Sequence, residues 1–242
     1  PVLNEAAEIR QFILHLRERL PEAEVLVVDG GSKDGSWQEL KGMRDEFSLR
    51  LLYSACGRAL QMNAGAAASR GEMLLFLHAD SRLPAGCDSA IASYLADPSA
   101  AGGCFRLSFP RPEWIYRVSD SLGNFAVDLF QIALGDHGIF CRRDAFLRVG
   151  GFPNLPLMED AEFYRALKGE GLVRQVRSKI TTSPRRYEEL GRYRTTFFYF
   201  LLLVLYVVKV SPYRLARWHR HFTRERTPER LVVLANGIRV LR

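Results

Sequence analysis

The hydrophobic positions of the first hundred residues alternate between two periodicities. Residues 5–20 carry apolar side chains at helical spacing until Pro21 ends the run, and residues 25–29 form a short β-branched run followed by two glycines. Ser36 and Glu39 have the S-x-x-E spacing of a capping box, which predicts a helix beginning there. Further strands are expected at 49–54 and 73–78, and further helices at 58–70 and 84–95.

This alternation of strands and helices predicts an α/β fold with a mainly parallel mixed sheet that helices cover on both faces. After residue 98 the pattern weakens. We expect a strand at 103–109, a partly apolar stretch at 114–134, a short strand at 138–141 and a helix at 160–169. The 242 residues fit one large domain with a tail, because single cores become hard to extend beyond roughly 250–300 residues.

The C-terminal part differs from the rest in charge. The net charge is +7, yet residues 1–178 hold 20 Lys/Arg against 23 Asp/Glu, whereas residues 179–242 hold 14 against 4. We therefore divide the chain into a domain at 1–183 and a basic helical extension at 184–242. The aromatic residues of this extension cluster apart from most of its arginines, which argues against binding to nucleic acid.

Residues 197–208 are twelve consecutive apolar residues, too few for a membrane span of about 20. Arginines follow at positions 214, 217, 220 and 224, spacings that put most of them on one helical face. Two interpretations remain open: a helix packed on the core or on a dimer partner, and an interfacial membrane helix. The four cysteines are scattered and form no disulfide or metal motif, so we expect a reduced cytoplasmic protein. If the interfacial interpretation holds, the protein is peripheral at the inner face of the plasma membrane.

Polar residues gather where the expected strands end, which is where open α/β sheets bind ligands. Asn4 and Glu5 end the first strand, Asp29 ends the next, and residues 78–80 end a third. Each carboxylate alone could be a helix cap, but together they favour a site. The loop at 29–36 lacks the spacing of a P-loop or a dinucleotide fingerprint. Its glycines, Gly31 among them, would let the backbone approach a base or ribose that hydrogen-bonds to Asp29.

Two further places carry candidate chemistry. Asp80 emerges after a continuous apolar strand and suits a divalent cation shared with substrate phosphates, with His78 as a second ligand or a hydrogen-bond donor. Glu159 and Asp160 stand at a helix start, where they serve either as caps or as a catalytic carboxylate that takes a proton from an alcohol.

The ordered segments PVLNE, VVDGGSKDGS, GRALQMNAG, RGEMLLFLHADS, GIFCRRDAFLRVGGFP and MEDAEF resemble the family-two glycosyltransferases of GT-A fold, over residues 1–170. The sequence is most similar to the radical-SAM/selenodomain-associated branch, in which LHAD replaces a double-aspartate motif. The resemblance implies a three-layer α/β/α fold and inverting transfer of a sugar from a nucleotide diphosphate sugar to an acceptor hydroxyl.

By this resemblance, Asp160 is the expected base beside Glu159, and Asp80 with His78 holds Mn²⁺ or Mg²⁺. The residues expected at the nucleotide sugar are Pro1, Leu3, Asn4, Glu5, Asp29, Gly31, Arg58, Asn63, His78, Ala79 and Asp80. The Gln/Arg-x-x-Arg-Trp signature of processive synthases is absent from the sequence, which favours non-processive transfer. Arg192 and Arg194, its nearest echo, either contact the diphosphate or simply flank the apolar helix.

We expect a UDP-sugar more than a GDP-sugar as donor, and the apolar tail suggests a lipid acceptor, a membrane surface or a homodimer. Two alternatives remain. A sugar nucleotidyltransferase would need a basic glycine-rich loop at the first strand end, where Asn4, Glu5 and Ala6 stand instead. A membrane-surface binding protein that has lost catalysis would rest on the tail alone.

Overall fold

The computed structural model describes residues 1–223, so Arg224 and the rest of the extension lie outside the described residues. The helices are α1 (Ile9–Arg19), α2 (Ser36–Met43), α3 (Arg58–Ala68), α4 (Cys87–Leu95), α5 (Trp114–Phe130), α6 (Arg143–Val149), α7 (Glu159–Leu167), α8 (Arg185–Leu190), α9 (Arg192–Val207) and α10 (Pro212–Thr223), with a 3₁₀ turn η1 (Gly135–His137). The strands are β1 (Val25–Asp29), β2 (Leu49–Tyr53), β3 (Met73–Phe76), β4 (Ser81–Arg82), β5 (Ala100–Ser108), β6 (Ile139–Arg142) and β7 (Leu172–Thr182).

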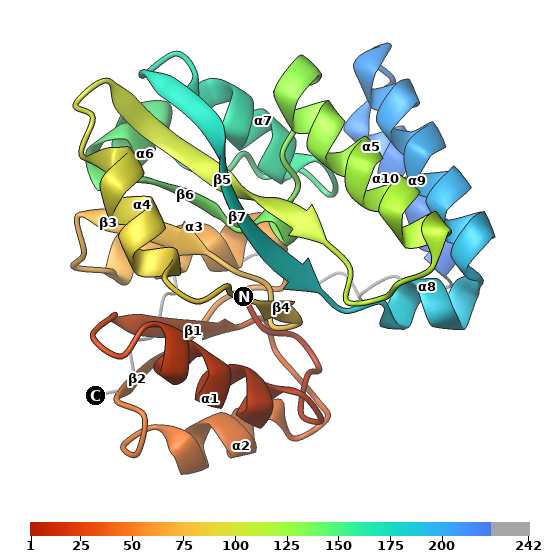
Figure 1. Cartoon of the computed structure of the whole chain (residues 1–242). Coiled ribbons are helices and arrows are strands. Elements are labelled where there is room, and N and C mark those ends of the chain that lie inside the picture. The colour runs from red at the N-terminus through yellow and green to blue at the C-terminus, as the bar shows by residue number, and fades with distance from the viewer. Residues whose placement is uncertain (224–242) are drawn as a thin grey trace.

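The strands form two sheets, with helices on both sides (Figure 1). β1 and β2 pair in parallel, and Val2 adds a parallel bridge to Asp29 at their edge. The larger sheet has the order β3-β6-β5-β7-β4. Within it β5 and β7 are parallel, while the other three neighbouring pairs are antiparallel. The expectation of a mixed sheet is confirmed, but parallel pairs do not predominate, because the chain returns from β5 through α5 and η1 and enters β6 in the opposite direction.

From residue 5 to residue 95 the expected elements are present with small shifts at their ends, but the strand expected before Asn4 is only an isolated bridge at Val2, and other features also differ from expectation. The capping box is wrong: Gly35, at φ +98°, precedes α2, and the Ser36 hydroxyl accepts from the Glu5 amide (2.8 Å) and donates to Asp34. This hydroxyl therefore joins α2 to the N-terminal loop. β4, α6 and β7 were not predicted, because β4 and α6 are short and only Val173, Ile180 and Thr182 of β7 are buried.

The C-terminal helices share a core with the rest of the molecule. Leu202 and Tyr206 of α9 and Leu215 of α10 are buried together with Ala126 of α5 and Ala161 of α7. One side of the apolar run thus packs on the core, as one of the two interpretations expected. Among the described residues, no helix combines the length and apolarity that crossing a bilayer requires.

Candidate active site

The N-terminal loop is hydrogen-bonded to the glycine loop that follows β1. The Asn4 amide donates to Ser32 Oγ (2.9 Å), and the Ala6 amide donates to Asp34 Oδ2 (2.9 Å). Asn4 lies at φ +57°, a left-handed conformation that asparagine tolerates better than most residues. The N-terminal loop and the loop after β1 are therefore hydrogen-bonded into one rim.

Asp29 is fully buried at this rim. Its Oδ2 accepts from the Gly31 and Ser32 amides at 3.0 Å each, and its Oδ1 accepts from the Ser32 hydroxyl. Gly31 has φ +94°, where a side chain would strain the backbone. Asp29 thus shapes the glycine loop, and its predicted contact with a base stays a prediction.

Gln61 joins the same strands from α3, and sequence reasoning missed it. Its Nε2 donates to the carbonyls of Val2 and Val28, at 2.8 Å each. A Cβ on Gly30 would lie 2.9 Å from Gln61 Oε1, so glycine is needed there for the amide to fit. The signal available in the sequence was a single large polar residue on the apolar side of an alanine-rich helix.

His78 and Asp80 follow β3 and meet Asp136 of η1. His78 Nδ1 lies 3.1 Å from Asp136 Oδ1. Burial opposes the charged imidazole, but Asp136 raises the pKa of His78 above its usual value. Burial would likewise raise the pKa of Asp136, yet the hydrogen bond with His78 lowers it to about 2. Burial and then Asp136 raise the pKa of Asp80, whose Oδ1 is buried and has no hydrogen-bond partner within residues 1–223.

Gly135 brings Asp160 against this group. Its amide donates to Asp160 Oδ2 at 2.7 Å, and Asp160 Oδ1 is buried without a partner among the described residues. A Cβ on Gly135 would lie 2.2 Å from His78 Nε2 and 3.0 Å from Asp160 Oδ2. Both side chains therefore touch the same glycine. His78 and Asp160, which are 82 positions apart in the sequence, meet as the predicted site requires.

Glu159 pairs with Arg58, the first residue of α3. Arg58 Nε lies 2.7 Å from Glu159 Oε1, and Glu159 is almost completely buried. Burial and then Asp160 raise the pKa of Glu159, while Arg58 opposes them. Met158, just before this pair, is at φ +67°, a strained conformation of the kind often found at functional sites. Glu159 thus forms an ion pair with Arg58, while Glu159 Oε2 and Asp160 Oδ1 are both buried without a hydrogen-bond partner among the described residues.

Two arginines of α8 extend the positive side of the site. Arg185 Nη2 lies 3.7 Å from Glu5 Oε2. Arg186 lowers the pKa of both Asp80 and Asp136, although burial of each carboxyl has the larger effect. Sequence reasoning missed these arginines because they belong to the basic extension, more than a hundred residues after Asp80.

Arg192 and Arg194 point elsewhere. Arg192 Nη1 forms an ion pair with Glu113 Oε1 at 2.9 Å, and the Arg194 guanidinium lies 4.9 Å from the centre of the Phe222 ring. Of the two alternatives, these contacts favour flanking charges of the apolar helix over a diphosphate contact.

The cluster is suited to a cation that substrate helps to hold. No group of three or more His, Cys, Asp or Glu side chains in a metal-binding arrangement occurs within residues 1–223. Mg²⁺ is commonly held by only one or two carboxylates, with substrate phosphates completing the shell. The orphaned Oδ1 of Asp80 and its repulsion from Asp136 are both relieved by a cation. The residues present therefore fit a divalent ion at Asp80, with His78 beside it.

The remaining predicted residues fall at the edges of the site. The Asn63 side-chain amide forms two hydrogen bonds with the backbone of Phe152, of 2.8 and 2.9 Å. These contacts hold the loop before α7 and do not direct the side chain at a ligand. Ala79 is buried in the core with residues of α1 and α4. Pro1 is half-buried and Leu3 is exposed at the rim.

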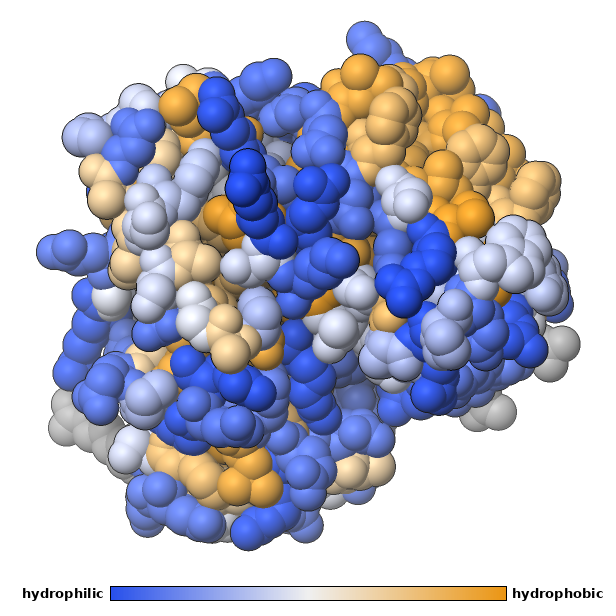
Figure 2. All heavy atoms as spheres, viewed as in Figure 1, coloured by the Kyte–Doolittle hydropathy of each residue, from blue (hydrophilic) through white to orange (hydrophobic). Residues whose placement is uncertain are grey.

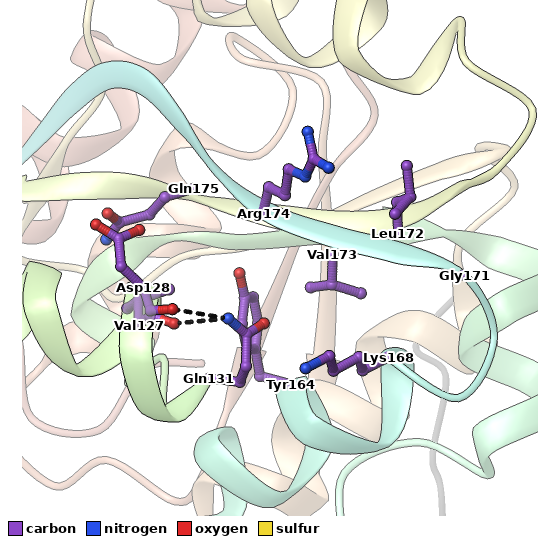
Figure 3. A pocket seen from close by; sticks show the side chains of 10 residues that line it. All are labelled: Val127, Asp128, Gln131, Tyr164, Lys168, Gly171, Leu172, Val173, Arg174 and Gln175. Carbon is purple, nitrogen blue, oxygen red and sulfur yellow. Dashed lines mark hydrogen bonds between the residues drawn. The ribbon is translucent and has the colours of Figure 1, made fainter.

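A cavity of about 560 Å³ lies elsewhere, between α5, the end of α7 and the start of β7 (Figure 3). Tyr164, Lys168 and Arg174 are among its lining residues, and the Gln131 amide donates across its edge to the carbonyls of Val127 and Asp128. Its lining includes none of the predicted site residues. Glu159 and Asp160 stand at the opposite end of α7, so this cavity is separate from the carboxylate cluster.

Comparison with known proteins places the chain in a family. The sequence model of glycosyl transferase family 2 matches residues 1–149, and the chain belongs to this family. The protein is therefore a glycosyltransferase. A search of the curated proteins found no match.

Solved structures show the same fold. A mannosyltransferase of Pyrobaculum calidifontis, solved with GDP-Man and Mn²⁺, has a TM-score of 0.65 at 19% identity, covering 92% of this chain and 68% of its own. Glucosyl-3-phosphoglycerate synthase of Mycobacterium tuberculosis, with Mn²⁺ and UDP-Glc, has a TM-score of 0.56 at 15% identity, covering 85% and 76%. TarS 1–349 of S. aureus, with UDP-GlcNAc, has a TM-score of 0.55 at 13% identity, covering 91% and 69%. The expected GT-A fold is confirmed.

Proposed function

We propose that this protein is an inverting, non-processive glycosyltransferase that moves a sugar from a nucleotide diphosphate sugar to an acceptor hydroxyl and depends on a divalent cation. The observation that carries the proposal is the meeting of Asp160 and His78 at Gly135, with Asp80, Asp136 and Arg58 around them. Unpartnered buried carboxylate oxygens beside arginines are costly to fold and suit a site that is completed by substrate.

In this mechanism Asp160 Oδ1 takes the proton of the acceptor hydroxyl, while the Gly135 amide fixes the other carboxylate oxygen. The acceptor oxygen attacks the anomeric carbon from the face opposite the diphosphate. As the new C–O bond forms, the bond to the diphosphate breaks and the diphosphate leaves with the electron pair, which inverts the anomeric centre.

The leaving diphosphate gathers negative charge, and the residues around it offer positive charge. Arg58, Arg185 and Arg186 lie at or near the carboxylates and would attract the diphosphate. Asp80 and His78 would hold Mn²⁺ or Mg²⁺, which would neutralise the charge that develops on the departing oxygen. Glu159 keeps Arg58 in place from a buried position.

We also propose a donor class and a branch of the family. The relatives solved with GDP-Man, UDP-GlcNAc and UDP-Glc support a nucleotide sugar donor, and we favour a UDP-sugar over a GDP-sugar. The sequence LHAD, with His78 in place of an aspartate, supports the radical-SAM/selenodomain-associated branch. A cytoplasmic location, a lipid acceptor and a homodimer stay predictions from the sequence.

A donor panel tests the proposal. The protein is incubated with UDP-Glc, UDP-GlcNAc and GDP-Man, with and without Mn²⁺, and the released nucleoside diphosphate is measured. We expect release from one donor class, only with the metal, and a product of inverted anomeric configuration by NMR. Formation of a nucleotide sugar and pyrophosphate from a nucleoside triphosphate and a sugar 1-phosphate would instead establish the nucleotidyltransferase alternative.

A further inference from the structure

Two helices carry the same unpartnered apolar stripe. On α5 it consists of Trp114, Val118, Phe125 and Leu129, which are 38–63% exposed. On α9 and the residue after it, the stripe consists of Tyr193, Phe197, Val204 and Val208, which are 39–66% exposed. The spacing i, i+4, i+11, i+15 is identical in both, so each helix shows one continuous apolar side to solvent. We call these eight residues the α5–α9 face.

The two stripes lie side by side and form one surface. The Trp114 and Tyr193 rings are 5.7 Å apart between centroids, and the helices are joined below the surface by a 2.9 Å hydrogen bond between the hydroxyls of Ser119 and Thr196. Figure 2 shows hydrophobic atoms gathered over the corner where Figure 1 places α5 and α9. The inner side of α9 is already used, because Leu202 packs in the core.

The α5–α9 face is large for a surface with no function. An aromatic side chain presents about 150–250 Å², so its four rings, each more than half exposed, contribute roughly 350–600 Å². The largest apolar patch on a typical monomer is about 300–600 Å² in all, and the four aliphatic residues add to the rings here. Such a surface marks an interaction site.

The charge near the α5–α9 face distinguishes two candidate partners, a second copy of this chain and an anionic lipid surface. Residues 192–223, which span α9 and α10, hold six Lys/Arg and no Asp/Glu. A second copy docked on the same face would bring two such basic regions together, and like charges across an interface are unfavourable. An anionic lipid surface would attract them, at about 1 kcal/mol per Lys or Arg near the membrane.

We propose that the α5–α9 face is a membrane-contact surface for bilayers that contain anionic lipids. Trp114 and Tyr193 have the amphipathic rings that settle at the boundary between headgroups and acyl chains. Arg194 at the start of α9 and Lys209 after its end flank the stripe with cations, as in helices that lie in the plane of the interface, whereas Arg192 is paired with Glu113. α5 has 17 residues and α9 has 16, fewer than the roughly 20 that a membrane-spanning helix needs, so the two helices would lie on the bilayer surface.

Vesicle sedimentation of the full chain tests this proposal without any sugar donor. The vesicles are phosphatidylcholine alone, or phosphatidylcholine with about a third phosphatidylglycerol, at low and high salt, so that both the lipid charge and its screening are varied. The test variant is Leu129→Glu/Phe197→Glu. The matched control is Leu147→Glu, which places the same charge at a residue of α6 that is 62% exposed.

We expect wild type and the Leu147→Glu variant to sediment with the anionic vesicles, and the partition coefficient to fall at least tenfold in the double variant and at high salt. A second measurement compares the tryptophan fluorescence of wild type with that of Trp114→Phe. The difference between the two is the emission of Trp114, and brominated lipid should quench it. Failure of wild type to bind, or equal binding by the double variant, would overturn the proposal. So would a wild-type dimer, by analytical ultracentrifugation, that the double variant dissociates.

Discussion

Replacing Asp160 by asparagine is expected to lower kcat by roughly 10²–10⁴-fold, the contribution typical of a general base. The asparagine Oδ1 can still accept the hydrogen bond from the Gly135 amide, so the loop keeps its shape while the proton acceptor is lost. The affinity for the nucleotide should change little, because Asp160 faces the acceptor in the proposed mechanism. Steady-state kinetics with the active donor and calorimetric titration of the nucleoside diphosphate measure the two effects separately.

The control for this variant is Asp144→Asn, which removes a surface carboxylate whose partner is Arg148 on the same helix. It should retain wild-type kinetics. Full activity in Asp160→Asn together with loss in Glu159→Gln would reassign the base to Glu159. Full activity in both would contradict a role for either carboxylate in proton transfer.

Gly135→Ala is expected to slow transfer by roughly 10²-fold without unfolding the protein. The new Cβ would lie 2.2 Å from His78 Nε2 and 3.0 Å from Asp160 Oδ2, so both side chains must shift from their present positions. Displacement of reacting groups by about 1 Å costs on the order of 10²-fold in rate, and overpacking costs roughly 1–3 kcal/mol of stability. Transfer rates and denaturant unfolding curves give both values.

Gly42→Ala is the matched control, because nothing lies within 4 Å of the added Cβ near the C-terminal end of α2. It should stabilise the protein by about 0.5–1 kcal/mol through helix propensity and leave transfer unchanged. If Gly135→Ala were as active as Gly42→Ala, the contact of His78 and Asp160 at this glycine would have no part in catalysis.

The sequence predicted the first half of the fold well, because each strand from residue 25 to 76 is a short apolar run bounded by glycines or by an amphipathic helix. β7 escaped prediction for a physical reason. Its core contacts come mainly from Val173 and Ile180, and the charged residues between them hide any period of two.

The candidate site was predictable where it follows strand ends and unpredictable where loops return to it. His78, Asp80 and Asp160 each stand at the boundary of a regular element, which is a signal that can be read in the sequence. Asp136 sits in a three-residue turn, and its only mark is a polar triplet ahead of a buried strand. The grip of Asn63 on Phe152 spans 89 positions, and no local pattern encodes such a contact.

The most direct measurement is calorimetric titration of UDP and of GDP into wild type and Asp80→Asn, each with and without Mn²⁺. A nucleotide that binds the folded protein and not the unfolded chain raises the free energy of unfolding, by about 2.7 kcal/mol when its concentration is a hundred times Kd. Thermal unfolding therefore provides an independent readout of binding. We expect one of the two nucleotides to bind wild type only with Mn²⁺, and this metal-dependent binding to disappear in Asp80→Asn. Binding that is the same with and without the metal, or the same in the variant, would contradict a cation held at Asp80.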